Sequence, residues 1–391
     1  MATAQTSIVP PKAPDSTPKY ALFDSNRVQE RKNYEGPSPY AERFTEGPSY
    51  IPKTLNLKPS GKLDGAYEFT EVTPQIGREY PKVQIREILK DEEKLRDLAI
   101  TVSRRGVVFF RNQDLTVEEQ KDLADKLGRL TGKPEDSSLH IHPILPAGGF
   151  IKNDGSGETD PEVSIISSKI GKQLYLKRFE GKKGSEGWHS DITFEPVPSN
   201  YAILKIIEPT PSGGDTLWAS GYALYEKLSP SLRKYLESLT GTYAQPGFKK
   251  AAEGKFDLWS DTRGAPENFG DELTAVHPIV RTNPVSGWKS IYSIGHHFTS
   301  FNELTERETS LLKGHLTELL LSSHDIQARF KWNKNDVAIW DNRSVYHTAT
   351  NDYYHSDIER TGVRTVGIGE RPYLDAKSRS RSEDLGEDFL I

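Results

Sequence analysis

Short β-prone segments that lie far apart along the chain are the feature that most restricts how this sequence can fold. Such segments occur at residues 163–167, 201–207, 275–282, 288–292, 336–340 and 363–368. Helix-like stretches around residues 221–240 and 303–321 interrupt them. A parallel βαβ fold alternates strands and helices at short intervals, whereas well-separated strands favour an antiparallel arrangement. The sequence therefore predicts a mainly β fold with inserted helices, built as a sandwich or jelly roll.

Two amphipathic segments precede most of these strands. Residues 91–104 carry acids in the first turn and apolar side chains on one face, and Gly106 follows them. This pattern is typical of a helix. A second helix is expected after Thr116, which forms a capping-box pattern with Glu119. The apolar run at 107–110 between the two helices predicts a short strand.

The two ends of the chain differ from its centre in composition. Residues 1–65 contain prolines spaced too closely for a helix or a central strand, so we expect an extended arm there. A globular domain is expected at 66–375, followed by a charged tail at 376–391. The arm also contains aromatic residues that could lie on a neighbouring surface.

Charge and hydropathy restrict the partners. The formal net charge is −5, and such a balance does not favour a nucleic-acid or acidic-membrane partner. No apolar run approaches membrane-spanning length, and the first ten residues lack a signal-peptide pattern. We therefore expect a cytoplasmic protein with a small-molecule substrate, no nucleic-acid or membrane partner, and a homo-oligomeric state.

Sulfur is nearly absent from the 391 residues, because the chain has no Cys and its single Met is Met1. The lack of Cys excludes a thiolate nucleophile, a disulfide framework, a Cys-type zinc site and an iron–sulfur cluster. Any metal must therefore be held by His and carboxylate side chains.

One segment has the residues for such a site. His189 and Asp191 lie two apart beside the β-prone run 192–194, and in a strand they would point to the same side. An ordinary strand with a buried His would show the same pattern. His355 and Asp357 repeat it in a polar stretch that we interpret as a surface loop.

A possible third ligand makes His189 and Asp191 the better candidate of the two pairs. His347 follows the predicted strand 336–340 and lies far downstream of His189, as expected for a long-range contact in a jelly roll. Two His and one carboxylate on one face of a metal form the facial triad of non-haem Fe(II) oxygenases.

Six motifs in this order are similar to one family. They are LHIHP at 139–143, WHSDITF at 188–194, GGDTLW at 213–218, HPIVRT at 277–282, IWDNR at 339–343 and RTGVR at 360–364. The sequence resembles the taurine/alkylsulfonate dioxygenase family of Fe(II)- and 2-oxoglutarate-dependent enzymes from about residue 74 to 374. The N-terminal arm resembles the longer, fungal members.

The resemblance implies a double-stranded β-helix core and a set of site residues. The implied iron ligands are His189, Asp191 and His347. Thr216 and Arg360 would bind the distal carboxylate of 2-oxoglutarate, and His142 and Arg364 would face the sulfonate. A spacing of four in a strand agrees for the arginines, since it places them on one face roughly 13 Å apart at about 3.3 Å per residue.

Several assignments within this set stay open. His140 could be the inward residue instead of His142, Arg364 could form a surface salt bridge, and Thr216 could be an ordinary strand residue. The Tyr that taurine enzymes carry three residues after the pocket His is Leu145 here. This difference puts taurine itself in doubt as the preferred sulfonate.

Some neighbouring residues are assigned no chemistry. We expect Asp341 and Arg343 to form a structural pair near the metal. The tryptophans of the motifs, Trp188, Trp218 and Trp340, are expected in the core.

The implied reaction is oxidative desulfonation. The carbon next to the sulfonate of an alkylsulfonate would be hydroxylated, which releases sulfite and an aldehyde together with succinate and CO₂, and serves sulfur assimilation. Alternatives are the same cofactors acting on alkyl sulfate esters or aryloxyalkanoates, or a metal-free jelly-roll binding protein. Low sulfur content would suit either an oxidant-producing enzyme or a protein made when sulfur is scarce, and chance is a third explanation.

Overall fold

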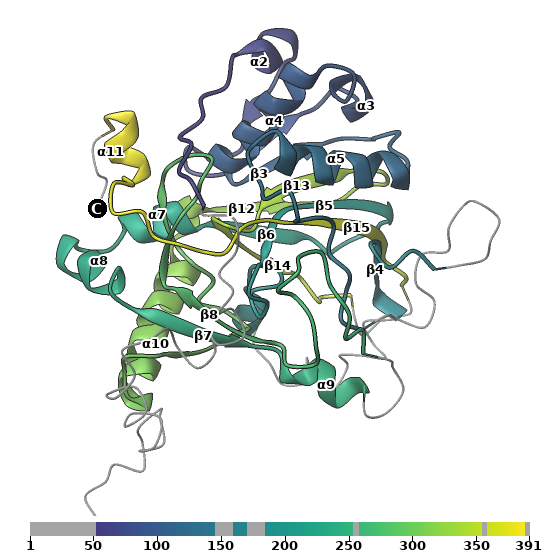
Figure 1. Cartoon of the computed structure of the whole chain (residues 1–391). Coiled ribbons are helices and arrows are strands. Elements are labelled where there is room, and N and C mark those ends of the chain that lie inside the picture. Colours follow the sequence, from purple (N-terminus) through teal and green to yellow (C-terminus); the bar gives the residue numbers. More distant parts are fainter. Residues whose placement is uncertain (1–51, 145–158, 170–183, 253–257, 354–357, 388–391) are drawn as a thin grey trace, which may run out of the picture.

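A seven-stranded sheet forms the centre of the molecule, with the strand order β1-β2-β3-β13-β5-β15-β4 (Figure 1). The computed structural model describes residues 52–144, 159–169, 184–252, 258–353 and 358–387. The strands of this sheet are β1 (Thr70–Glu71), β2 (Arg78–Tyr80), β3 (Val107–Phe110), β4 (Ser164–Ser167), β5 (Ser199–Glu208), β13 (Val337–Asp341) and β15 (Thr361–Ile368). Strands β2 and β3 pair in parallel, and the other neighbours pair antiparallel.

A three-stranded antiparallel sheet faces the large one. Its order is β12-β6-β14, formed by β12 (Gln327–Phe330), β6 (Thr216–Ser220) and β14 (Val345–Ala349). Phe109 of the large sheet stacks on Phe330 with ring centroids 4.2 Å apart and meets the edge of Trp218 at 5.2 Å. The two sheets thus enclose one apolar core, as a sandwich does.

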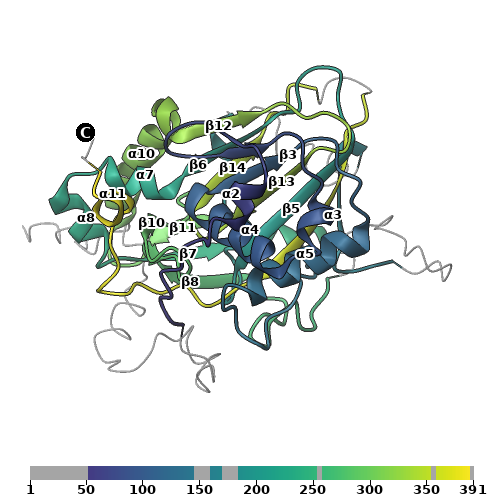
Figure 2. The ribbon, with the colours of Figure 1, turned by 90° about the horizontal axis from the view of Figure 1, so that it is seen from above.

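Two helices cover the other face of the large sheet (Figures 1 and 2). They are α4 (Glu92–Arg105) and α5 (Val117–Arg129), and the capping box of Thr116 and Glu119 is present at the start of α5. Along β13 the residues alternate, because Val337 and Ile339 contribute to the core under the helices and Ala338 and Trp340 to the core between the sheets. The central strands are therefore buried on both faces.

The rest of the chain extends the sandwich at one end. A second three-stranded sheet, β11-β7-β8, consists of β7 (Thr240–Ala244), β8 (Thr274–Pro278) and β11 (Phe298–Phe301), and β9 (Val280–Thr282) pairs with β10 (Lys289–Ile291). Besides α4 and α5, the helices of the described residues are α2 (Lys62–Ala66), α3 (Ile85–Ile88), α7 (Gly221–Glu226), α8 (Pro230–Leu236), α9 (Pro246–Ala252), α10 (Glu306–Ser322) and α11 (Arg381–Leu385), with 3-10 turns η2 (Gly184–Gly187) and η3 (His324–Ile326). A separate apolar cluster joins α7, α8 and α10 to these strands.

Two expected elements are split in the structure. The stretch 221–240 forms two helices and not one, because Pro230 begins α8 and Ser229 adopts an extended conformation as its cap. The expected strand 275–282 is broken into β8 and β9 after Pro278, and Ile279 N–H donates to Leu239 O. Strands β1, β2, β6, β7, β11, β12 and β14 were not predicted.

Both ends of the described chain lie on the same surface. Leu55 N–H donates to Pro284 O at 2.8 Å, Thr54 Oγ1 to Asp375 Oδ2 at 2.6 Å, and Lys58 forms an ion pair with Asp384. Residues 1–51 of the expected arm lie outside the described residues. The arm ends within the short helix α2, and the expected charged tail contains the helix α11.

None of the helices in the described part of the chain is long and apolar enough to cross a membrane.

Candidate functional site

The segment 187–195, which we name the ligand loop, carries two of the predicted ligands. His189 and His347 form an isolated antiparallel bridge, with His189 N–H donating to His347 O at 3.0 Å and His347 N–H to His189 O at 2.7 Å. After Ser190 the chain turns, and Ile192 has a left-handed φ of 62°. The expectation that 192–194 continues a strand is therefore wrong. A turn, and not a strand pleat, brings Asp191 to the side of His189.

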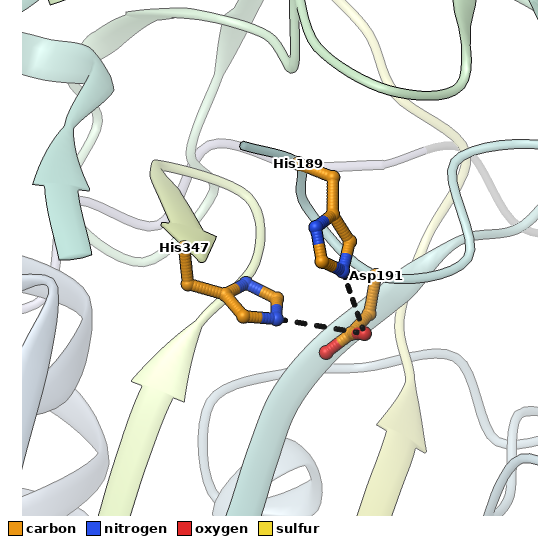
Figure 3. Close-up of side chains that lie close together, drawn as sticks. All are labelled: His189, Asp191 and His347. Atoms are coloured by element: carbon orange, nitrogen blue, oxygen red, sulfur yellow. Dashed lines mark ion pairs between the residues drawn. The ribbon is translucent and has the colours of Figure 1, made fainter. Parts of the chain in front are cut away.

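Three side chains meet at this point. Asp191 Oδ1 lies 3.9 Å from His189 Nε2 and 3.8 Å from His347 Nε2. Figure 3 shows the two imidazoles and the carboxylate pointing toward one another, with His347 coming from β14. One ligand atom from each residue lies within 4.8 Å of the other two, so the group could hold a metal ion.

The donor set fits a non-haem iron ion. His189 Nδ1 lies 2.8 Å from Gly187 O, which fixes the ring and directs Nε2 to the site. Asp191 Oδ2 is buried and has no hydrogen-bond partner among the described residues. Two imidazole nitrogens and one carboxylate oxygen, without thiolate, are the ligands of a facial Fe(II) triad.

The charges around the group favour metal binding. Burial opposes ionisation of Asp191, but Arg364, whose Nη1 donates to Oδ1 at 2.7 Å, and the nearby histidines outweigh it and hold the Asp191 pKa below its ordinary value. Burial lowers the pKa of His347 to about 3. Asp191 is therefore charged and His347 neutral near neutral pH, which are the protonation states of metal ligands.

The two residues expected to bind 2-oxoglutarate lie near each other. Arg360 precedes β15, and its Nε donates to Gly214 O at 3.0 Å, just before Thr216 begins β6. Gly213 and Gly214 both have positive φ, and a Cβ on Gly214 would lie 3.0 Å from Arg360 Cδ. The Gly-Gly pair thus lets the chain pass closely over the arginine. The Thr216 hydroxyl accepts from Trp332 Nε1 at 3.0 Å.

The predicted substrate residues Arg364 and His142 lie near Asp191. Arg364 of β15 contacts Asp191 directly, so its side chain is not on the outer surface. His142 Nδ1 lies within hydrogen-bond distance of the Ile144 backbone, and burial together with Arg364 lowers the His142 pKa to about 4. Leu145, His355 and Asp357 lie outside the described residues.

Side chains that were assigned no role in the sequence analysis hold the ligand loop. Asn342 Oδ1 accepts from Asp191 N–H at 3.0 Å, and Ser199 Oγ donates to Asp191 O at 2.8 Å. His277 Nε2 lies 2.9 Å from Thr193 O. The IWDNR and HPIVRT motifs could have directed attention to Asn342 and His277, but no local pattern indicates which loop they contact.

A buried charged network lies behind these contacts. Arg343 donates from Nε and Nη2 to the two carboxylate oxygens of Asp341 at 2.7 and 2.8 Å, which confirms the expected structural pair. Glu370 joins Arg343 to Arg281 of the HPIVRT motif. Trp188, Trp218 and Trp340 are all buried, as expected.

A β-sandwich with two imidazoles and one carboxylate converging beside an arginine, Arg364, is the arrangement of a non-haem iron oxygenase. The chain belongs to the family described as Taurine catabolism dioxygenase TauD, TfdA family, which matches residues 68–366.

Named relatives agree with this family. The chain is 44% identical over 344 residues to alpha-ketoglutarate-dependent dioxygenase btcD of Neocamarosporium betae, a match that covers 84% of this chain and 97% of that protein. It is 32% identical to an alpha-ketoglutarate-dependent sulfonate dioxygenase of Saccharomyces cerevisiae, covering 80% of this chain and 69% of that protein.

A solved structure is also similar. A taurine dioxygenase from Burkholderia xenovorans aligns with a TM-score of 0.58 and 28% identity, over 79% of this chain and 91% of that one. The chain is thus an alpha-ketoglutarate-dependent dioxygenase, and the family implies iron, 2-oxoglutarate (alpha-ketoglutarate) and O₂ for its reaction.

Proposed function

We propose that this dioxygenase acts on an alkylsulfonate and hydroxylates the carbon next to the sulfonate group. The observation that carries the proposal is Arg364, a cationic side chain 2.7 Å from the candidate ligand Asp191 with His142 near it. A substrate anion held there would have its adjoining carbon close to the metal. The similarity to the yeast sulfonate dioxygenase supports the same class of substrate.

The metal ligands in this proposal are His189 and Asp191 of the ligand loop and His347 of β14. We further propose that these sheets form a jelly-roll core. The bridge between His189 and His347 supports this arrangement, because it links the ligand loop to β14 of the smaller sheet. When bound, Fe(II) with 2-oxoglutarate and O₂ supplies the oxidising chemistry.

The protein then supplies binding and orientation. Arg360, which is buried beside Gly214, would pair with the distal carboxylate of 2-oxoglutarate, and Thr216 would hydrogen-bond to it. Arg364 and His142 would hold the sulfonate and thereby fix which carbon faces the metal. The hydroxylated carbon loses sulfite and becomes an aldehyde, while 2-oxoglutarate becomes succinate and CO₂.

Product analysis tests the substrate class. Sulfonates should yield sulfite in equal amount to succinate, whereas an alkyl sulfate ester would yield sulfate and an aryloxyalkanoate would yield neither. A panel of these three classes, assayed for sulfite, sulfate and succinate, distinguishes them. Succinate formed with sulfate and without sulfite would overturn the proposal.

A second experiment tests the metal and 2-oxoglutarate assignments. Anaerobic addition of Fe(II) and 2-oxoglutarate should give a visible metal-to-ligand absorption, and Arg360→Ala should weaken the affinity for 2-oxoglutarate. Arg364→Ala should keep this absorption and lose sulfonate turnover. If Arg364→Ala instead loses 2-oxoglutarate binding, the roles of the two arginines are exchanged.

A further inference from the structure

His140 and His142 lie on the same side of one extended segment. Leu139 forms a bridge with Gly367, and His140 N–H donates to Val366 O at 2.8 Å, which holds the segment beside β15. On its other side is Gly264, where a Cβ would lie only 2.5 Å from Leu139 O. The two imidazole centroids are 6.3 Å apart. The imidazole rings of His140 and His142 are therefore close neighbours on the same side of the segment.

The surroundings of His140 differ from those of an ordinary core histidine. The residue is 4% exposed, and neither ring nitrogen has a hydrogen-bond partner among the described residues. A neutral imidazole carries one donor and one acceptor, and buried polar atoms of this kind nearly always meet a partner. The charged groups that face it are Arg364, Arg263 and Asp191, with His142 as its titratable neighbour.

Arg364 shows the same deficit. Its Nη1 donates to Asp191, but its Nε is buried and has no hydrogen-bond partner among the described residues. Arg263 is different, because its Nε and Nη2 donate to the two carboxylate oxygens of Glu195. His140 and Arg364 thus both carry buried nitrogens without a hydrogen-bond partner among the described residues. Ile144 engages Nδ1 of His142 and leaves its Nε2 available.

Three donors suit an anion with three terminal oxygens. A sulfonate and a sulfate ester both present three such oxygens, whereas a carboxylate presents two. Building on the proposed function, we propose that His140 is a specificity-determining residue that donates to the third oxygen of a tetrahedral –SO₃⁻ group, alongside Arg364 and His142. Sequence reasoning treated His140 and His142 as alternatives, but the geometry gives both a place.

The consequence is selectivity by group shape. Arg364 and one histidine satisfy a planar carboxylate, and His140 then keeps an unsatisfied nitrogen. A site with a buried polar group that a competing ligand leaves unpaired discriminates strongly against that ligand. Wild-type protein should therefore bind an alkanesulfonate more tightly than the carboxylate of equal chain length.

Binding measurements test this assignment without relying on turnover. Anaerobic protein loaded with Mn(II) and 2-oxoglutarate is titrated calorimetrically with pentanesulfonate, pentyl sulfate and hexanoate. His140→Phe keeps the ring shape and removes both nitrogens, and it should weaken binding of the preferred –SO₃⁻ probe about tenfold while changing hexanoate affinity less than twofold. The affinities for Mn(II) and 2-oxoglutarate should not change. His140→Gln, which restores a donor, should recover part of the loss.

Matched controls separate the outcomes. His315→Phe on the exposed face of α10 should leave every affinity unchanged. The sulfonate and sulfate arms identify which source of the –SO₃⁻ group is preferred. Equal weakening of all three probes by His140→Phe, altered 2-oxoglutarate affinity, or unchanged sulfonate affinity with a more stable protein would overturn the role of His140. If wild-type protein binds no –SO₃⁻ probe, the proposed function fails together with this inference.

Discussion

The ligand loop and strand β14 deliver side chains to the same point by different means. His347 lies in the middle of β14, which pairs residue by residue with β6 from Val345 to Ala349. Asp191 lies in a turn that contains the left-handed Ile192 and has no strand neighbour at that position. Its backbone is held by side chains instead, from Asn342 and Ser199.

This difference shows which kind of contact fixes each ligand of the candidate metal site. A strand places His347 through backbone hydrogen bonds that almost any sequence could make. The loop depends on particular residues, because a single substitution can remove one of its supports. Mutations that act on metal binding from outside the ligand set should therefore concentrate around the loop.

The largest effect is expected at the ligands themselves. Asp191→Ala and His347→Ala should both abolish metal binding and turnover, since each removes one of three donors. Only Asp191→Ala also leaves Arg364 without its buried counter-charge, which should lower the free energy of unfolding by about 3 kcal/mol. Calorimetric Mn(II) titration and urea unfolding of the metal-free proteins measure both quantities. Equal stabilities of the two variants would contradict the Arg364–Asp191 pair.

Removal of a loop support comes next. Asn342→Ala deprives the Asp191 N–H and the Trp340 Nε1–H of their acceptor. We expect metal affinity to fall about 10- to 100-fold, as for other residues that orient ligands. Asn283→Ala is the matched control, because Asn283 donates to Asp341 and does not contact the loop. It should lower stability and leave metal affinity unchanged; a similar loss of affinity in both variants would argue against a specific role of Asn342.

Acid should act on the loop through His277. Burial lowers the pKa of His277 to about 3, against an ordinary value of 6.5. Between these values the unfolded chain binds a proton that the folded chain does not, so stability is lost as pH falls below 6.5. At pH 5 the loss from this group should be about 2 kcal/mol. Urea unfolding at pH 7 and 5 should show a smaller decrease for His277→Gln than for wild type, and parallel decreases would exclude the effect.

The smallest effect is expected from the loss of a single hydroxyl, either one that supports the ligand loop or one on β14. Ser199→Ala removes the hydrogen bond to Asp191 O, and Tyr346→Phe removes that of a β14 side chain to Ile291 O. Each should lower stability by about 1 kcal/mol. Only Ser199→Ala should weaken metal binding, by a few fold. Reversal of this order in Mn(II) titrations would mean that the strand, and not the loop, limits the site.

The sequence predicts local features of this fold better than long-range pairing. The helix after the capping box at Thr116 and the strand expected at 336–340 depend on neighbours in the chain, and both predicted elements are present. Strands β6 and β14 were missed because each is short and is stabilised by pairing with the other from more than a hundred residues away. Splitting of the 221–240 stretch follows from Pro230, whose effect on Ser229 was available in the sequence.

In the candidate site, too, local features could be predicted from the sequence and long-range contacts could not. His189, Asp191 and His347 were found from residue type and spacing, and the structure brings them together. The reason given for Asp191 was wrong, since a turn and not a strand orients it. The contact of Asn342 with Asp191 spans 151 residues, and no local periodicity reports such a contact.

The attachment of residues 54–58 to the end of the chain has a consequence for the order of events during synthesis. Thr54 bonds to Asp375, a partner 321 residues later, and Lys58 bonds to Asp384. Chains emerge from the ribosome N-terminus first, at about 5–20 residues per second, so this early segment waits roughly 15 to 65 seconds for its partners. Its backbone acceptors Pro284 and Val285 are synthesised earlier than Asp375 and Asp384, so the contacts with that surface can form first.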